Sequence, residues 1–284
     1  MRPARRVTAL ALIAAFAAAG ANAQRTPSET ENIDARLRPA LGAFERGDYA
    51  QAAHGFQPLA AEGIPDAQYL LALALESMKS ADQLKAAHDW YLRAAQSGHA
   101  AAANNLGAMY YDGRGVARDH AAALGWYRQS AERGNLEAQH NLALMYGMGL
   151  GAVRDDAEML RWLERAAKSG YARSQAQLGR LYLDGEGVPP NPPEAAKWFR
   201  VAAEGGDQWG QYFLGVLLQK GHGVARNLEA AHDWYLRAAS AGHVLAMQEL
   251  ARVYELGLGV PSDAQKAKSW QDRAAKQQGP GPGK

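Results

Sequence analysis

The ten residues AAHDWYLRAA occur twice in this 284-residue chain, at Ala86–Ala95 and again at Ala230–Ala239. The two copies begin 144 residues apart, which is four steps of 36 residues, and the intermediate steps are also occupied. A fixed period of this length is typical of a repeat protein. One tryptophan, Trp209, lies outside the register. The six in register are Trp90, Trp126, Trp162, Trp198, Trp234 and Trp270.

Each 36-residue repeat predicts two helices joined by a glycine-containing loop. In the repeat after His99, apolar residues at helical spacing predict the first helix: Ala102, Leu106, Met109 and Tyr110. Positions that recur in every later copy have a physical reason, because glycine suits positive φ and Asp or Asn caps a helix start. The loop glycines are Gly113/Gly115, Gly149/Gly151, Gly185/Gly187, Gly221/Gly223 and Gly257/Gly259. The caps are Asp119, Asp155, Asn191, Asn227 and Asp263, and the closing glycines are Gly98, Gly134, Gly170, Gly206 and Gly242.

The copies at the two ends depart from this pattern. Ser77 and Lys79 stand where later repeats have loop glycines, so the first internal loop should differ. The last repeat has Gln271 where earlier copies have a large apolar residue, which predicts a terminal cap with a polar outer face. We expect an atypical helix pair over residues 33–65 and a disordered tail over residues 279–284.

The N-terminus predicts export. Arginines, an apolar run and the small residues at 21–23 read as a signal peptide over residues 1–23, followed by a flexible leader over 24–32. A membrane anchor is the alternative, although the run is shorter than the ~20 residues of a spanning helix. We therefore expect a periplasmic or secreted mature chain that does not insert into a membrane. Without residues 1–23 the chain has 28 basic and 29 acidic residues, which gives no general reason to bind nucleic acid.

The repeat resembles the Sel-1-like repeat, a relative of the tetratricopeptide repeat, over residues 66–278. The residues that carry the resemblance are Leu178-Gly179, Tyr182, Gly185, Gly187-Val188, Ala195, Trp198-Phe199, Ala202-Ala203 and Gly206. The resemblance implies an all-α fold, a right-handed α/α superhelical solenoid of about seven antiparallel helix pairs. It also implies a non-enzymatic adaptor that binds a protein or peptide partner, with a regulatory or assembly role in the cell envelope.

The sequence shows no catalytic, metal or cofactor motif. The G-x-G loops lack the rest of a nucleotide fingerprint, and the histidine pairs His88/His232 and His99/His243 are copies made by the repeat. We therefore predict no enzyme and no cofactor. The alternative is an envelope protein that acts on peptidoglycan or a β-lactam. The resemblance suggests this through a cysteine-rich branch, but the chain has no cysteine.

A partner-binding surface is predicted on the first helices, which should line the inner face of the solenoid. Amide and methionine side chains suit an extended peptide, although ordinary solvated or packing positions would explain them equally. Trp209 is either an exposed anchor or a filler beside Gly205-Gly206 and Gly210. The predicted residues are Asn105, Met109, Asn141, Met145, Gln177 and Phe213, with Leu181, Leu217, Glu249 and Val253 along the same stripe.

Overall fold

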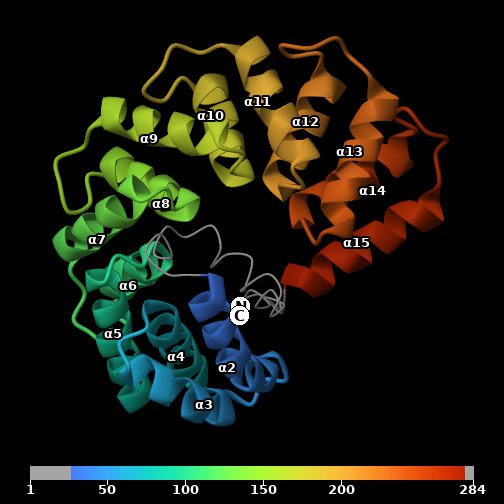
Figure 1. Cartoon of the computed structure of the whole chain (residues 1–284). Helices are drawn as coiled ribbons and strands as arrows, with labels where there is room; N and C mark the ends of the chain where they lie inside the picture. Colours follow the sequence, from blue (N-terminus) through green and yellow to red (C-terminus); the bar gives the residue numbers. More distant parts are fainter. Residues whose placement is uncertain (1–26, 279–284) are drawn as a thin grey trace, which may run out of the picture. The chain divides into compact units, whose positions relative to one another are not determined.

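The computed structural model describes residues 27–278, and these contain helices and no strands. The predicted signal peptide and tail lie outside the described residues. The described chain forms two compact units that divide after Asp155. Figure 1 labels their helices in chain order. In both units, each helix packs against the next one in sequence. This confirms the all-α repeat of helix pairs, while the right-handed superhelical sense stays a prediction.

The first unit contains helices α2 to α8. Helix α2 begins at Pro27 rather than at Ile33, so residues 27–32 of the expected leader belong to a helix. Pro27 stands at its first residue, where proline is tolerated, and the helix continues through Pro39. The bounds are α2 Pro27–Glu45, α3 Tyr49–Ala61, α4 Pro65–Met78, α5 Ala81–Gln96, α6 Ala100–Asp112, α7 His120–Glu132 and α8 Leu136–Met148.

The second unit contains helices α9 to α15, drawn from green to red in Figure 1. All but the last have the same length of 13 residues, as a strict repeat requires. The bounds are α9 Asp156–Lys168, α10 Ala172–Asp184, α11 Pro192–Glu204, α12 Gln208–Lys220, α13 Leu228–Ser240, α14 Val244–Leu256 and α15 Ala264–Gln278.

The predicted caps and glycines end the helices as expected. The carboxylate of Asp119 accepts a hydrogen bond from the backbone N–H of Ala122 at 2.9 Å, and Asn191 and Asn227 cap α11 and α13 in the same way. The first glycine of each loop ends the first helix with positive φ, for example Gly113 at 74°. Since L side chains rarely adopt this conformation, the recurrence of glycine follows from the backbone.

In several repeats the most deeply buried ring is the residue that follows the tryptophan. Tyr91, Phe199 and Tyr235 are 0–1% exposed. Phe199 packs on Gly179 of the preceding helix, where an added Cβ would lie 2.7 Å from its ring. Glycine in the Leu-Gly pair of the first helix therefore makes room for the ring of the second helix.

The tryptophans of the register differ in burial, because Trp162 and Trp270 are buried and the other four are partly exposed. Trp90 and Trp234 are partly exposed, and an arginine three residues later covers the ring. The guanidinium carbon of Arg93 lies 4.6 Å from the Trp90 ring centroid, and that of Arg237 lies 4.5 Å from Trp234. These cation–π pairs cover the partly exposed indole rings on the second helices.

Both end repeats differ as predicted. In the first, the loop shrinks to Lys79 and Ser80, because α4 continues through Ser77. Lys79 has φ 62°, the conformation that glycine provides elsewhere. In the last, Gln271 is exposed while its counterparts in the other repeats are buried. None of the helices within residues 27–278 has the length and apolarity that a membrane crossing needs.

Candidate functional site

The first helices place one partly exposed residue at the same position of every repeat. We call this set the first-helix row. Neighbouring members are 36 residues apart, and each is partly buried. Tyr69 and Phe213 also pack against the hydrophobic core of their units. The row consists of Tyr69, Asn105 and Asn141 in the first unit and of Gln177, Phe213 and Glu249 in the second.

The residues one turn further along these helices are buried, which corrects part of the predicted surface. Met109 is 0% exposed and Met145 is 1% exposed, and both pack in the core. Leu181, Leu217 and Val253 are buried in the same position. Each first helix packs against the second helix of its own repeat and against the preceding repeat, so its buried arc is wide. These side chains are therefore not available to a partner.

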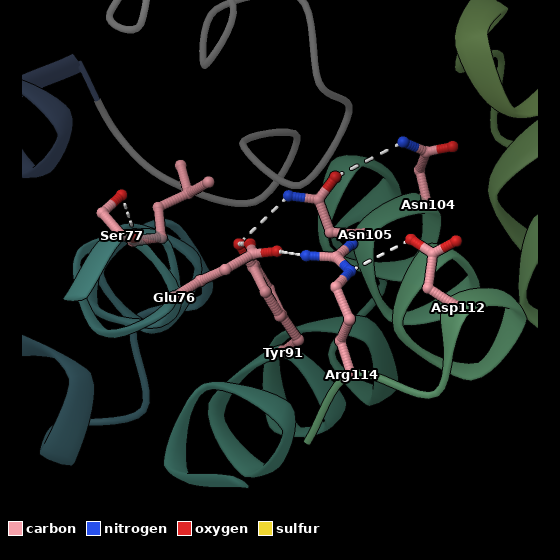
Figure 2. A network of polar contacts seen from close by, with 8 residues as sticks. Glu76, Ser77, Tyr91, Asn104, Asn105, Asp112 and Arg114 are labelled. Carbon is pink, nitrogen blue, oxygen red and sulfur yellow. Dashed lines mark hydrogen bonds and ion pairs between the residues drawn. The ribbon is translucent and has the colours of Figure 1, made fainter. Parts of the chain in front are cut away.

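Five polar residues of the first unit form a directional chain of four hydrogen bonds, shown in part in Figure 2. Asn141 donates through Nδ2 to Oδ1 of Asn104 at 3.2 Å, and Asn104 donates to Oδ1 of Asn105 at 3.4 Å. Asn105 then donates to the hydroxyl of Tyr91 at 3.1 Å, and Tyr91 donates to Oε2 of Glu76 at 2.7 Å. The chain crosses from α8 to α6, α5 and α4, so it links successive repeats.

The chain of hydrogen bonds ends at the carboxylate of Glu76. Glu76 pairs with the Arg114 guanidinium, whose Nε also donates to Asp112 at 3.0 Å (Figure 2). Burial raises the pKa of Tyr91 well above its usual value, and the charge of Glu76 raises it further. The phenol is therefore a neutral donor at physiological pH. Arg114 is 38% exposed and Asp112 is 50% exposed, so both remain accessible to a partner.

The sequence did not single out Glu76, Tyr91 or Arg114 as members of a surface. Arg114 lies between the two loop glycines, where the later repeats have Leu150, Glu186, His222 and Leu258. A position that accepts arginine, leucine, glutamate and histidine is not fixed by the loop. The variation at this position could have marked Arg114 as a functional residue. It does not predict that Arg114 pairs with Glu76.

In the second unit the row is aromatic at its centre. Phe213 on α12 stacks on Phe199 with ring centroids 4.9 Å apart, and Trp209 stacks on Phe213 at 5.9 Å. Trp209 is 51% exposed. The alternative of a gap filler does not fit, because a Cβ on Gly210 would lie 2.6 Å from that of Ala202. The helices are in close contact there, and Trp209 is an exposed ring.

The histidines have structural surroundings. His99 and His243 cap α6 and α14 by accepting from backbone N–H groups through Nδ1. His88 and His232 each lie between an aspartate and a tyrosine hydroxyl, at nearly the same distances in both copies. Within residues 27–278, no cluster of histidine and carboxylate side chains could hold a metal ion.

The repeat pattern and the helix pairs define an α-helical repeat protein. The Sel1 repeat model matches residues 65–99, 100–135, 136–171, 172–207, 210–243 and 244–278. The chain belongs to the Sel1 repeat family. Proteins of this family are generally non-enzymatic scaffolds for protein interactions.

Solved structures show the same fold. A Sel1 repeat protein from Oxalobacter formigenes is 31% identical with a TM-score of 0.74, and the match covers 84% of this chain and 96% of the other. A protective antigen present in uropathogenic Escherichia coli strains is 29% identical with a TM-score of 0.74. That match covers 95% of this chain and 56% of the antigen. A search of functionally curated proteins finds no match.

Proposed function

We propose that this protein is an exported scaffold of the bacterial cell envelope, which binds a protein or peptide partner through its first-helix row and catalyses no reaction. The observation that carries the proposal is the contrast between constant and variable positions. Capping residues, loop glycines and small packing residues recur from repeat to repeat. The row changes from tyrosine to asparagine, glutamine, phenylalanine and glutamate. Residues that the fold does not dictate are free to serve recognition.

The amides of the first unit suit a peptide backbone. An asparagine side chain offers both a donor and an acceptor, as a peptide group does. Asn141 uses Nδ2 to donate to Asn104, which leaves Oδ1 as the side-chain acceptor at the start of the hydrogen-bond chain. Because the chain fixes the orientation of each amide, a bound peptide would lose little extra side-chain entropy.

The signal-peptide pattern of residues 1–23 supports the envelope location. The absence of cysteine is compatible with an oxidising compartment, since no thiol is present to form a wrong disulfide. Fractionation of cells that express a C-terminally tagged chain tests the location. The proposal predicts a periplasmic or secreted product shortened by residues 1–23. A full-length cytoplasmic product would contradict it.

Crosslinking in intact cells tests the scaffold role. We expect the tagged chain to capture one dominant envelope protein, and the double change Asn105→Ala and Asn141→Ala to reduce the capture strongly. The matched control is Gln96→Ala and Gln129→Ala, on second helices of the same unit. Equal capture by both double variants would refute binding through the row. Turnover of a cell-wall or β-lactam substrate by the purified chain would refute the non-catalytic role.

A further inference from the structure

The second unit presents an apolar strip on α12 that the repeat does not require. Trp209, Phe213 and Val216 lie at helical spacing along one face, and all three are exposed or partly exposed. At the position of Trp209, the neighbouring repeats have Arg173 on α10 and Leu245 on α14. An arginine and a leucine serve equally well there, so the fold does not select a tryptophan.

Packing holds the exposed tryptophan in one orientation. The Trp209 ring stacks on Phe213 and meets the imidazole of His243 edge to face, with ring centroids 4.5 Å apart. The preceding residue, Gln208, donates through Nε2 to the backbone oxygen of Ala241 at 2.8 Å. A half-exposed ring that is already ordered binds an apolar side chain without a further entropic cost, and such tryptophans dominate many interfaces.

Arginines flank the strip. Arg180 on α10 and Arg252 on α14 stand 36 residues before and after Val216, and their side chains are 46% and 52% exposed. Arg180 lies 3.9 Å from the carboxylate of Glu186, and Arg252 forms an exposed ion pair with Glu249 at 3.1 Å, one helical turn before it. Exposed pairs of this kind are weak, so a partner's carboxylate can replace them. Helices α10 and α12 are in contact. Arg173 and Lys220 extend the basic border, while Asp184 and Glu249 are the acidic residues in the same rows.

We infer that this strip binds an acidic linear segment of a partner protein, with an apolar side chain on Trp209 and Phe213 and carboxylates on Arg180 and Arg252. Arginine pairs with carboxylates through two parallel hydrogen bonds, and the positive surplus of the border is complementary to such a segment. A nucleic acid fits less well, because Asp184 and Glu249 would repel a continuous phosphate backbone. The inference rests on the proposed function, since it names the chemistry of a protein partner.

Fluorescence anisotropy with labelled peptides tests this inference on the purified chain. The probe is a short peptide with one phenylalanine flanked by glutamates. Its counterparts have lysines for the glutamates, or serine for the phenylalanine, and a single-stranded DNA oligonucleotide of equal charge is the fourth probe. We expect the glutamate–phenylalanine peptide to bind at least about tenfold more tightly than each of the others. Equal affinity for the lysine peptide, or tighter binding of the oligonucleotide, would overturn the inference.

Variants of the chain localise the binding. Trp209→Ala should weaken the acidic peptide about tenfold or more. The double change Arg180→Glu and Arg252→Glu should transfer the preference to the lysine peptide, and it keeps the inference testable if Trp209→Ala does not fold. Leu236→Ala and Arg200→Glu, at exposed positions of α13 and α11, are the matched controls. An unchanged preference in the double variant would place the binding elsewhere.

The two proposals fail separately. Asn105→Ala with Asn141→Ala should leave binding of the acidic peptide unchanged, because both residues belong to the first unit. If the chain captures an envelope protein but binds no acidic peptide, the inference is wrong and the scaffold role stands. If it binds the acidic peptide but captures no protein in cells, the envelope role is wrong.

Discussion

The hydroxyl of Tyr91 stands at the centre of the polar chain in the first unit. It donates to Glu76 and accepts from Asn105, so one oxygen serves two repeats. Its counterpart Tyr235 donates only to Oε1 of Gln219, at 2.7 Å. Substitution of Tyr91 and of Tyr235 therefore measures how much the chain of hydrogen bonds contributes to the free energy of unfolding.

Tyr91→Phe should lower the free energy of unfolding by about 1–3 kcal/mol, because it leaves the partly buried Asn105 amide without its acceptor. Tyr235→Phe should cost about 1 kcal/mol, the net value of one hydrogen bond. Urea denaturation of both variants measures the difference. Equal losses would show that the chain acts as separate bonds rather than as a network.

The buried imidazole of His243 predicts a dependence of stability on pH. Burial lowers the pKa of His243 to about 4 from the usual 6.5. Its Nε2 is buried without a hydrogen-bond partner among the described residues. The corresponding atom of His99 also has no hydrogen bond there, but it lies 3.5 Å from the Asp66 carboxylate. The neutral form is therefore the one that the folded state accepts.

Because the folded pKa lies below the unfolded one, the contribution is fully present above about pH 6.5 and is lost as the pH falls towards about 4. The loss should reach on the order of 3 kcal/mol. His243→Asn keeps a cap acceptor but does not titrate, so its stability should fall less over this window. Thermal unfolding at a series of pH values compares the two proteins. Parallel curves would contradict the assigned pKa.

The candidate site contains residues whose exposure could not be predicted from the sequence. Asn105 and Asn141 are partly exposed, but Met109 and Met145, one turn away, are buried. The helical spacing places Asn105 one turn from Met109 on α6, and Asn141 one turn from Met145 on α8. It does not define how wide the buried arc is, because that depends on packing against two neighbours at once. The exposure of Trp209 depended in the same way on the close contact at Gly210.

At the scale of the elements, a glycine in the first helix and a ring in the second determine how closely the pair packs. Gly179 faces Phe199, Gly107 faces Tyr127, and Gly215 faces Tyr235. The helix bounds, loop positions and caps could be predicted from the 36-residue period, because each depends on local backbone chemistry. The ring that fills the pair could not, since Trp198 and Phe199 are adjacent and only packing decides which is buried.

Gly179→Ala should destabilise the protein by about 1–3 kcal/mol, because the new methyl group would overlap the Phe199 ring. Gly125→Ala is the matched control in α7, where an added Cβ meets nothing within 4 Å. That change should stabilise the protein by about 0.5–1 kcal/mol through better helix propensity. Denaturation midpoints of both variants provide the test. A neutral Gly179→Ala would mean that Phe199 repacks freely.

At the scale of the whole molecule, the described chain is a series of repeats with a polar end. Trp162 in α9 is 3% exposed and donates through Nε1 to Glu158 at 3.1 Å. Trp270 in α15 is 9% exposed, and the adjacent Gln271 and Asp272 are exposed. A terminal repeat packs on one neighbour only. Removal of the Trp270 side chain should therefore disturb fewer contacts than removal of the Trp162 side chain.

Trp162→Ala should cost about 3–5 kcal/mol, because it leaves a large cavity in a repeat with neighbours on both sides in sequence. Trp270→Ala should cost less, since the last turn of the array can relax around it. Chemical denaturation of the two variants measures the difference. Equal losses would contradict the interpretation of α15 as a cap.

Site-specific photocrosslinking in intact cells shows whether a protein partner binds the first-helix row. A photoreactive amino acid is introduced singly at Asn105, Asn141, Gln177 and Glu249, and at Gln96, Gln129 and Arg200 on second helices. We expect adducts with one envelope protein from the first-helix positions and none from the second-helix positions. Adducts that arise equally from both sets, or from the second helices alone, would contradict it.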